Sequence, residues 1–381
     1  MTEAPAHFNH AGMSIPPPSV LARVLDHLRL EADVGGYEAA ERVADELDAV
    51  PADLAALLGV DPDEVCVTES ATRAFEMFVW SWALSSNLRV GDRILLDQFA
   101  YATMWSTLDR LALSIDVTVE LVAATPAGVI DVDDLVARLD EDVRLVLITH
   151  VPTHVGTVTD AADVVARIRA AGSDAVVVLD VSQTLGQLDV DLRAIGCDVA
   201  FAPGRKFLRA PRGTGALAIR RPLADELAPL AVPFGVDARA RSGVLALPPG
   251  ARRFDMFDSG MAARLGLGEA ARLASSIGMA TIEAGVRRRS DDVRAVLASC
   301  AGVRLTGTPD DVGIVSFVHE TVDPDEIRGR CQAAGVNVWV NMPGGAPLDA
   351  ASRGGLPSVR VSPHHVTTDD DLARLAAALI T

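Results

Sequence analysis

Lysine is almost absent from this chain of 381 residues. Lys206 is the only one, and every other basic side chain belongs to an arginine or a histidine. A general preference for arginine over lysine is an effect of composition and carries no information about function. A single lysine is different, because arginine stays protonated in proteins, whereas a lysine amine can lose its proton when buried and attack a carbonyl. Taken alone, Lys206 fits a lysine that forms a Schiff base and a chance survivor on a surface loop about equally well.

Cysteine and long apolar runs are scarce as well. The four cysteines are widely scattered and show no metal-ligand spacing, which predicts no metal site and fits a reduced, cytoplasmic compartment: Cys66, Cys197, Cys300 and Cys331. No apolar run approaches the roughly 20 residues that span a bilayer, and the first residues lack the basic start and apolar run of a signal peptide. The formal net charge of −18 argues against nucleic acid or an anionic membrane as the main partner.

Short β-rich runs alternate with helical patterns in the middle of the chain. This alternation predicts an α/β fold, in which a largely parallel sheet is covered by helices on both faces. The seven expected strands are 65–68, 93–97, 117–122, 144–149, 175–180, 199–202 and 215–219. In such sheets ligands bind at the carboxyl ends of the strands, so we expect the chemistry there.

The two ends of the chain have a different pattern. Helices are expected over residues 19–32 and 37–58, and a long helical stretch over about 260–297 leads into an α+β region with strands near 313–319, 336–341 and 358–362. We therefore predict a large domain over residues 31–249 and a smaller C-terminal domain over 250–381, which an N-terminal arm over 1–30 joins.

Several expected strands end in side chains that suit a cofactor. Ser70, Ala71 and Thr72 follow the first strand at a helix start, where backbone N–H groups bind a phosphate or where the serine is a simple N-cap. Tyr101, one of only two tyrosines, follows the second strand and either stacks on a flat ring or is an ordinary half-buried aromatic. Neither residue set decides the matter alone.

Asp180 and Lys206 end two neighbouring strands of this predicted sheet. A carboxylate at the end of an apolar strand is costly to bury without a partner, and a protonated pyridine nitrogen is a suitable one. A lysine, a carboxylate and an anion site at one sheet edge indicate pyridoxal phosphate. Lys206 would form the Schiff base, and Asp180 would keep the ring nitrogen protonated, so that the ring accepts electrons from a carbanion.

The sequence resembles the class V aminotransferase family of fold type I pyridoxal-phosphate enzymes, which includes the cysteine desulfurases. Residues 180–186 look like the family's aspartate–x–x–glutamine segment, and residues 205–215 look like its lysine loop. The resemblance implies a large domain with a mainly parallel seven-stranded sheet, a smaller α+β domain, and a homodimer. It also implies the following roles: phosphate binding by Ser70, Ala71, Thr72 and Arg205, ring stacking by Tyr101, contacts to the ring nitrogen and phenolic oxygen by Asp180 and Gln183, and binding of the substrate α-carboxylate by Arg360.

Four positions depart from the family pattern. Arg205 stands where the family commonly has histidine, Pro203 stands where it has serine, and Tyr101 stands where desulfurases often have histidine. Thr153 or His154 replaces an asparagine that contacts substrate or cofactor. Thr153 and His154 both remain candidates for binding the substrate.

A narrower resemblance connects the chain with the branch that contains the hercynylcysteine sulfoxide lyases. It rests on residues 8–12, 31–37, 253–258 and 262–268. It implies that Tyr37 faces the substrate, although an aromatic lid on a helix start is the alternative. The shape of the substrate pocket is expected to depend on loops around His10, Tyr37, His154 and Ala346.

The choice of reaction depends on a missing cysteine. By resemblance, a desulfurase carries its sulfur-accepting cysteine near residues 342–355, and this stretch has none. We therefore predict a carbon–sulfur β-lyase that releases thiol, pyruvate and ammonia from an S-substituted cysteine, with Lys206 as the base and Tyr101 or Tyr37 protonating the sulfur. Transamination, a decarboxylating oxidative deamination and a non-catalytic cofactor-binding protein are the alternatives.

Overall fold

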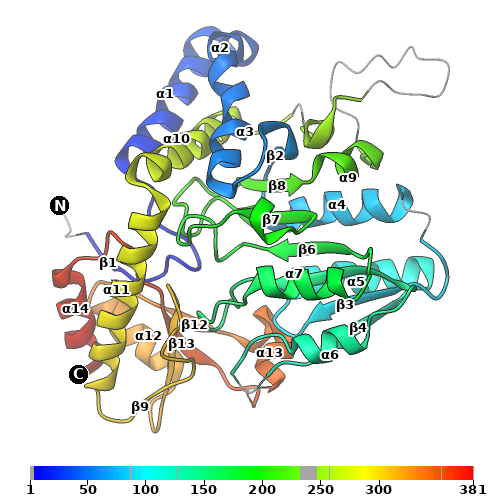
Figure 1. Ribbon diagram of the computed structural model, residues 1–381. Coiled ribbons are helices and arrows are strands. Elements are labelled where there is room, and N and C mark those ends of the chain that lie inside the picture. Colours follow the sequence, from blue (N-terminus) through cyan, green and yellow to red (C-terminus); the bar gives the residue numbers. More distant parts are fainter. Residues whose placement is uncertain are drawn as a thin grey trace.

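A twisted seven-stranded sheet forms the centre of the large domain (Figure 1). The computed structural model describes residues 4–85, 88–125, 127–231, 247–256, 258–352 and 354–380. Phe257 and Arg353, which belong to stretches used in the sequence comparison above, lie outside the described residues. The strands are β2 (Val65–Thr68), β3 (Arg93–Asp97), β4 (Thr118–Val122), β5 (Val143–Thr149), β6 (Val176–Asp180), β7 (Val199–Pro203) and β8 (Gly215–Ile219), in the order β2-β8-β7-β6-β5-β3-β4. β8 is antiparallel to both neighbours and the other pairs are parallel, which confirms the predicted fold class.

Helices cover both faces of this sheet. On β5, Leu145 and Leu147 point into one apolar core, and Val146 and Ile148 point into the other, as the alternation of a strand requires. The first core is closed by α4 (Ala71–Ser85) and α5 (Ala102–Ile115), and the second by α3 (Ala44–Leu58), α6 (Val132–Ala137), α7 (Ala161–Ala170) and α10 (Met261–Ile277). Burial on both faces explains why the central strands are apolar throughout.

A smaller antiparallel sheet forms the second domain. Its strands are β9 (Val303–Leu305), β10 (Val315–His319), β12 (Trp339–Asn341) and β13 (Ser358–Val361), in the order β12-β13-β10-β9. The N-terminal β1 (Ala6–His7) pairs in parallel with β11 (Val336–Asn337), so the chain begins in the domain where it ends. Phe8, Phe317 and Leu375 lie in its core, with α12 (Pro324–Ala333) and α14 (Asp369–Ile380) beside the sheet.

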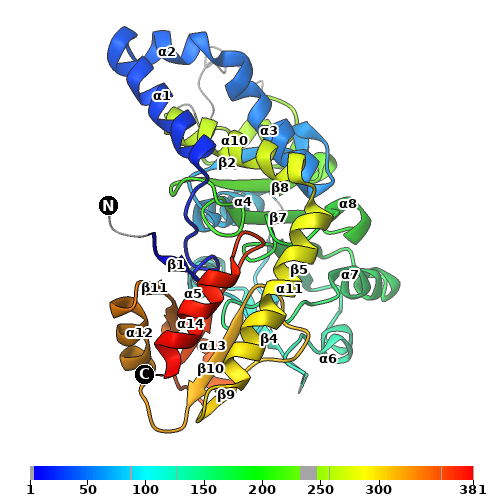
Figure 2. The same cartoon turned by 90° about the vertical axis from the view of Figure 1, so that its left-hand side faces the viewer.

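The packing differs from the predicted domain boundaries at both ends. α1 (Pro18–Val34) belongs to the predicted arm, yet it lies against α10 at the far end of the large domain (Figures 1 and 2). Leu267, Ala270 and Ala271 of α10 lie in the large-domain core, although the sequence pattern changes at residue 249. The reason is that strands give way to helices there while the same core continues.

Breaks at Gly278 and Val43 divide the two long helices that were expected from the sequence. The stretch 260–297 is two helices, α10 and α11 (Met279–Ala298), separated at Gly278, whose φ of 89° is in the left-handed region. The stretch 37–58 is likewise α2 (Gly36–Arg42) and α3. In the described part of the chain, no helix is both long and apolar enough to cross a membrane.

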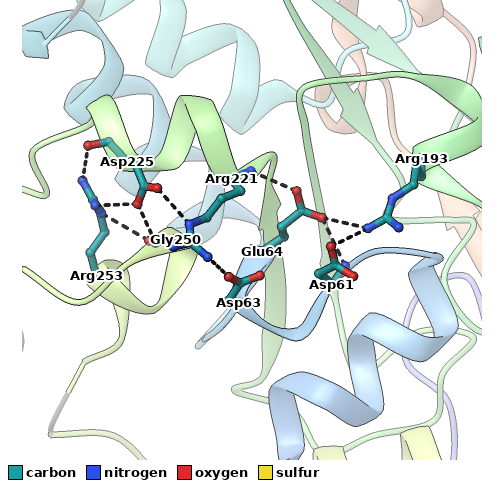
Figure 3. A network of polar contacts seen from close by, with 8 residues as sticks. All are labelled: Asp61, Asp63, Glu64, Arg193, Arg221, Asp225, Gly250 and Arg253. Carbon is teal, nitrogen blue, oxygen red and sulfur yellow. Dashed lines mark hydrogen bonds and ion pairs between the residues drawn. The ribbon is translucent and has the colours of Figure 1, made fainter.

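An ion-pair network fastens the outer edge of the sheet (Figure 3). Asp225 on α9 (Arg221–Glu226) accepts from Arg221 Nε at 2.8 Å, from Arg253 at 2.9 Å and from the Gly250 amide at 2.8 Å. Arg221 also pairs with Asp63, next to Glu64, whose Oε1 accepts from the Arg221 amide at 2.9 Å. The network holds η1 (Pro62–Glu64), α9 and η2 (Gly250–Phe254) together.

Gly250→Ala is expected to destabilise this edge. Gly250 has a φ of 64°, and a Cβ there would lie 2.2 Å from the Asp63 carbonyl oxygen. We expect the free energy of unfolding to fall by about 1–3 kcal/mol from the strained backbone alone, measured by urea denaturation. Gly329→Ala is the matched control, because it lies on α12 with open space around it and should stabilise the helix. Equal effects of the two substitutions would contradict the argument.

Candidate active site

The strands place their polar ends around one cavity. Asp180 ends β6, Thr149 ends β5 directly beside it, and Lys206 follows the end of neighbouring β7. A cavity of about 590 Å³ opens at this edge, and residues of the small domain, Trp339, Asn341 and Arg360, complete its wall. The cavity therefore lies where the carboxyl ends of parallel strands predict a ligand site.

Most of the residues singled out in the sequence come together here. The cavity is lined by Ser70, Ala71, Thr72, Tyr101, Thr153, His154, Asp180, Gln183, Arg205, Lys206 and Arg360. They come from both domains and are spread over some three quarters of the chain. His10 and Tyr37 are not part of this lining.

The amine of Lys206 has an altered acidity. Its pKa is lowered to about 7, mainly because burial disfavours the ammonium ion and then because Arg205 and Arg360 lie nearby, while Asp180 opposes the shift. A large fraction of this amine is therefore neutral at physiological pH. A neutral lysine can attack a carbonyl and can accept a proton.

We expect this shift to appear as a pH dependence of the stability of the cofactor-free protein. Between the lowered pKa of about 7 and the usual lysine pKa of 10.5, the unfolded chain holds a proton on Lys206 that the folded chain lacks. Through this group, stability rises with pH across that window. Lys206→Met should therefore be more stable than the wild type at and below pH 7, by a margin that shrinks toward pH 10.5. Urea unfolding of both proteins across this pH range measures the margin, and a constant margin would refute the shift.

Asp180 is buried, and a second buried carboxylate, Asp97, lies at a nearby strand end. Burial raises its pKa, although the amide of Ser182, which donates to Oδ1 at 2.8 Å, and Lys206 both favour the charged form. Asp97, at the end of β3, accepts from the Thr149 hydroxyl at 3.0 Å and from the Phe99 amide at 2.9 Å, and burial raises its pKa to about 7. Asp97 was not predicted from the sequence, and it fixes the strand end beside Asp180.

Two buried polar atoms in the cavity wall lack a partner within the described residues. They are Oε1 of Gln183 and Nε of Arg360. The remaining atoms of both side chains are held in place: Gln183 donates to the Ala11 carbonyl at 3.2 Å and to Thr153 Oγ1 at 3.1 Å, and Arg360 donates to the Thr153 carbonyl at 3.0 Å. Buried groups of this kind are normally satisfied, which indicates a ligand that offers a hydroxyl and a carboxylate.

One corner of the cavity is suited to an anion. The hydroxyl of Ser70 accepts from the Arg73 amide at 3.1 Å and so caps α4, which leaves the other amides of the first turn oriented toward the cavity. A Cβ on Gly215 would lie 2.9 Å from the Ser70 carbonyl carbon, so β8 supports this turn closely. The half-buried Arg205 adds a positive charge to the same cavity.

The N-terminal arm holds the backbone of the lysine loop. The Ser14 hydroxyl donates to the Lys206 carbonyl at 2.6 Å, and the Ser14 amide donates to the Arg205 carbonyl at 2.9 Å. Because that hydroxyl has one proton, its 2.7 Å contact with His10 Nδ1 is a bond that the histidine donates. Ser14 was not predicted, since nothing in the sequence connects it with residue 206.

The structure corrects the expected position of His10. Its ring is buried against His7 and His364, with ring centres 4.8 and 4.9 Å apart, and burial lowers its pKa well below the usual range. The neighbouring Asn9 lines the cavity instead, with Oδ1 3.4 Å from Arg360 Nη2. The motif was recognised, but the residue that reaches the site from it is the preceding one.

Tyr37 is also away from the cavity of its own chain. It lies at the start of α2, beyond the turn at Gly35, and its side chain is 73% exposed. Figure 1 shows α2 at the far end of the molecule from the small domain. Within one chain, Tyr37 therefore does not face the site.

Comparisons with known proteins agree with this geometry. A sequence model of the class-V aminotransferases matches residues 6–375. A probable hercynylcysteine sulfoxide lyase from Mycobacterium tuberculosis is 30% identical over 98% of this chain and 89% of the relative. A probable cysteine desulfurase from Methanothermobacter thermautotrophicus is 27% identical over 97% of this chain and 92% of the relative.

Solved structures show the same fold. The apo cysteine desulfurase of Thermococcus onnurineus NA1 superposes with a TM-score of 0.88 at 19% identity, covering 98% of this chain and 93% of that one. The cystine C–S lyase C-DES, in complex with its product cysteine persulfide, superposes with a TM-score of 0.86 at 21% identity over 99% and 97%. A C-DES mutant with glycine covalently linked to the PLP cofactor has a TM-score of 0.87 at 20% identity over 99% and 96%.

Proposed function

Since the chain belongs to the class V aminotransferases and is a pyridoxal-phosphate enzyme, we propose that it is a carbon–sulfur β-lyase acting on an S-substituted cysteine. Its products would be a thiol or related sulfur acid, pyruvate and ammonia. The residues fit the cofactor: Lys206 for covalent attachment, Asp180 for the ring nitrogen, the unpartnered Oε1 of Gln183 for the phenolic oxygen, and the α4 turn with Arg205 for the phosphate.

The burial and the raised pKa of the cysteine thiols support β-elimination over desulfuration. A desulfurase transfers sulfur to a protein thiolate, and thiolates of this kind are exposed and have a lowered pKa. Here all four cysteines are free and buried, and burial raises the pKa of each thiol, to about 12 for Cys197 and about 11 for Cys331. None of them lines the cavity. These thiols are poor sulfur acceptors, so elimination is the better supported reaction.

The side chains of the cavity can perform this elimination. When bound, pyridoxal phosphate supplies a carbonyl for the substrate amine and a ring that accepts the electrons released at Cα. Arg360 would hold the α-carboxylate with its fork of N–H donors, and so fix the Cα–H bond relative to the ring. The neutral amine of Lys206 would take the α-proton. Departure of the sulfur with the electrons of the Cβ–S bond leaves a product that water converts to pyruvate and ammonia.

A substrate screen tests this function. The purified protein, loaded with pyridoxal phosphate, is incubated with S-alkyl, S-aryl and S-oxide cysteine conjugates, including hercynylcysteine sulfoxide because of the lyase relative. Pyruvate and the sulfur product in equal amounts are the expected result. Carbon dioxide or an aldehyde would replace the proposal with decarboxylating deamination, a keto acid that retains sulfur would indicate transamination, and alanine with persulfide would indicate desulfuration.

We also propose that two chains associate. α1 exposes Leu21, Leu25 and Leu28 to the extent of 52%, 40% and 47%, at a spacing that places them on one face of the helix. An exposed apolar stripe of this kind is typical of an interface. Light scattering should give a dimer for the wild type and a monomer for Leu25→Glu; a monomeric wild type would contradict the proposal.

A further inference from the structure

His154, in the cavity wall, forms a buried pair with Asp349 behind it. His154 lies in the loop after β5, and Asp349 lies on α13 (Pro347–Ser352) of the small domain. Nδ1 of His154 is 3.2 Å from Oδ2 of Asp349, with the two side chains 9% and 1% exposed. The pair therefore joins the two domains at the edge of the site.

The other nitrogen of this ring faces the cavity. The backbone of His154 is fixed, because its carbonyl accepts from the Ser316 hydroxyl at 2.6 Å and from Asn341 Nδ2 at 3.1 Å. Nε2 lies 3.7 Å from the point that a Cβ on Gly345 would occupy, and a ring carbon of Tyr101 lies 3.7 Å from the same point. His154, Gly345 and Tyr101 all line the cavity.

This arrangement is suited to donating a proton. A carboxylate against Nδ1 favours the tautomer that carries the proton on that nitrogen, as it does in histidine–aspartate pairs generally. In the described part of the chain, Nε2 has no hydrogen bond. A proton on Nε2 would face the space between His154 and Tyr101.

We propose that His154 is the acid that protonates the departing sulfur and that Asp349 is the residue that positions it. The proposal rests on the β-lyase function above. As the Cβ–S bond breaks, its electron pair passes to sulfur, and sulfur takes the proton from Nε2 to leave as a neutral thiol. His154 remains neutral with its proton on Nδ1 beside Asp349, and it regains a proton at Nε2 from water.

The proposal predicts a dependence on the leaving group. An alkyl thiolate is a strong base and needs a proton as it departs, whereas 4-nitrothiophenolate is a weak base and does not. For His154→Gln we expect kcat with S-ethylcysteine to fall by about 10²–10⁴-fold, the range of general acid catalysis, and kcat with S-(4-nitrophenyl)cysteine to fall less than about tenfold. Asp349→Asn should show the same selectivity in weaker form.

Tyr101→Phe is the matched control, since Tyr101 borders the same space. If His154 is the acid, this variant slows both substrates to a similar extent. Selectivity for the alkyl substrate in Tyr101→Phe and not in His154→Gln would transfer the role to the tyrosine and overturn the proposal. Equal losses for both substrates in His154→Gln would reduce His154 to a structural residue and overturn it as well.

A spectroscopic measurement tests the pair without turnover. In holoenzyme labelled with ¹⁵N in the histidine rings, the signals assigned to His154 by their loss in His154→Gln should show Nδ1 protonated in every state of the ring, and Nε2 protonated as well in the form that donates. Asp349→Asn should shift that population, and a ring protonated at Nε2 alone in the wild type would refute the pairing. If no S-substituted cysteine yields thiol and pyruvate with the wild type, the proposed function fails; if the wild type does yield them and the leaving-group pattern is absent, only the inference on His154 fails.

Discussion

Replacing Lys206 by arginine is expected to abolish turnover and the visible absorbance of the bound cofactor. The wild-type amine has a pKa lowered to about 7, so it can be neutral, attach covalently and accept the α-proton. A guanidinium keeps the positive charge but can do neither. Loss of a general base costs about 10²–10⁴-fold in rate, and the loss of covalent attachment adds to it. Absorbance spectra and a pyruvate assay of both proteins measure the two effects.

Lys206→Ala tests whether the variants lose activity because the amine itself is missing. Added methylamine can enter the space left by the side chain and accept a proton, which would restore part of the activity of Lys206→Ala. It cannot do so in Lys206→Arg, where the guanidinium fills that space. Retention of more than a tenth of wild-type activity in either variant would exclude Lys206 as the base.

Arg360→Ala is expected to raise KM about 10²-fold, with a smaller effect on kcat. Arg360 lies on β13, buried to 95%, and although burial lowers its pKa to about 10, it remains charged at neutral pH. Hydrogen bonds between charged groups contribute about 1.5–3 kcal/mol each, and 1.4 kcal/mol corresponds to tenfold. Arg360→Lys should recover little, since an ammonium cannot present two parallel donors to a carboxylate. Steady-state kinetics with one S-substituted cysteine measure both constants.

A substrate without the carboxylate provides the control for Arg360. The wild type should process the S-substituted cysteamine as poorly as Arg360→Ala processes the cysteine. Combining the variant with the cysteamine should then cause little further loss, because both changes remove the same interaction. Additive losses would show that Arg360 acts on something other than the α-carboxylate.

The strand ends could be predicted from the sequence because each apolar run stops at a polar residue or at a proline. β6 ends at Asp180 and β7 at Pro203, and the neighbouring parallel strands place Asp180 and the lysine loop together as expected. The antiparallel direction of β8 was not predicted, because the apolar run 215–219 looks the same in either direction. The length of the connection 204–214 could have indicated it, since this connection is shorter than the roughly dozen residues that a parallel crossover needs.

Side chains that reach the site from distant segments could not be predicted in the same way. Ser14, Asn9 and Asp349 act through contacts with residues far away in the sequence. Their identities suit many surface positions, and only the packing of the two domains gives them a role. His10 shows the converse, since a correctly recognised motif still leaves open which of two neighbouring side chains faces the cavity.

The docking of the N-terminal arm has a consequence for biosynthesis. Asn9 pairs with Ser362, β1 pairs with β11, and Ala11 accepts from Gln183, so an early-synthesised segment completes the site beside one that is synthesised much later. At a synthesis rate of about 5–20 residues per second, the arm waits on the order of 20–70 s for its partner strand. Throughout that interval, the side of the lysine loop that the N-terminal arm covers in the folded protein is exposed to water. The nascent chain is therefore expected to acquire its cofactor in a closed pocket only after the segment that contains Ser362 has been synthesised.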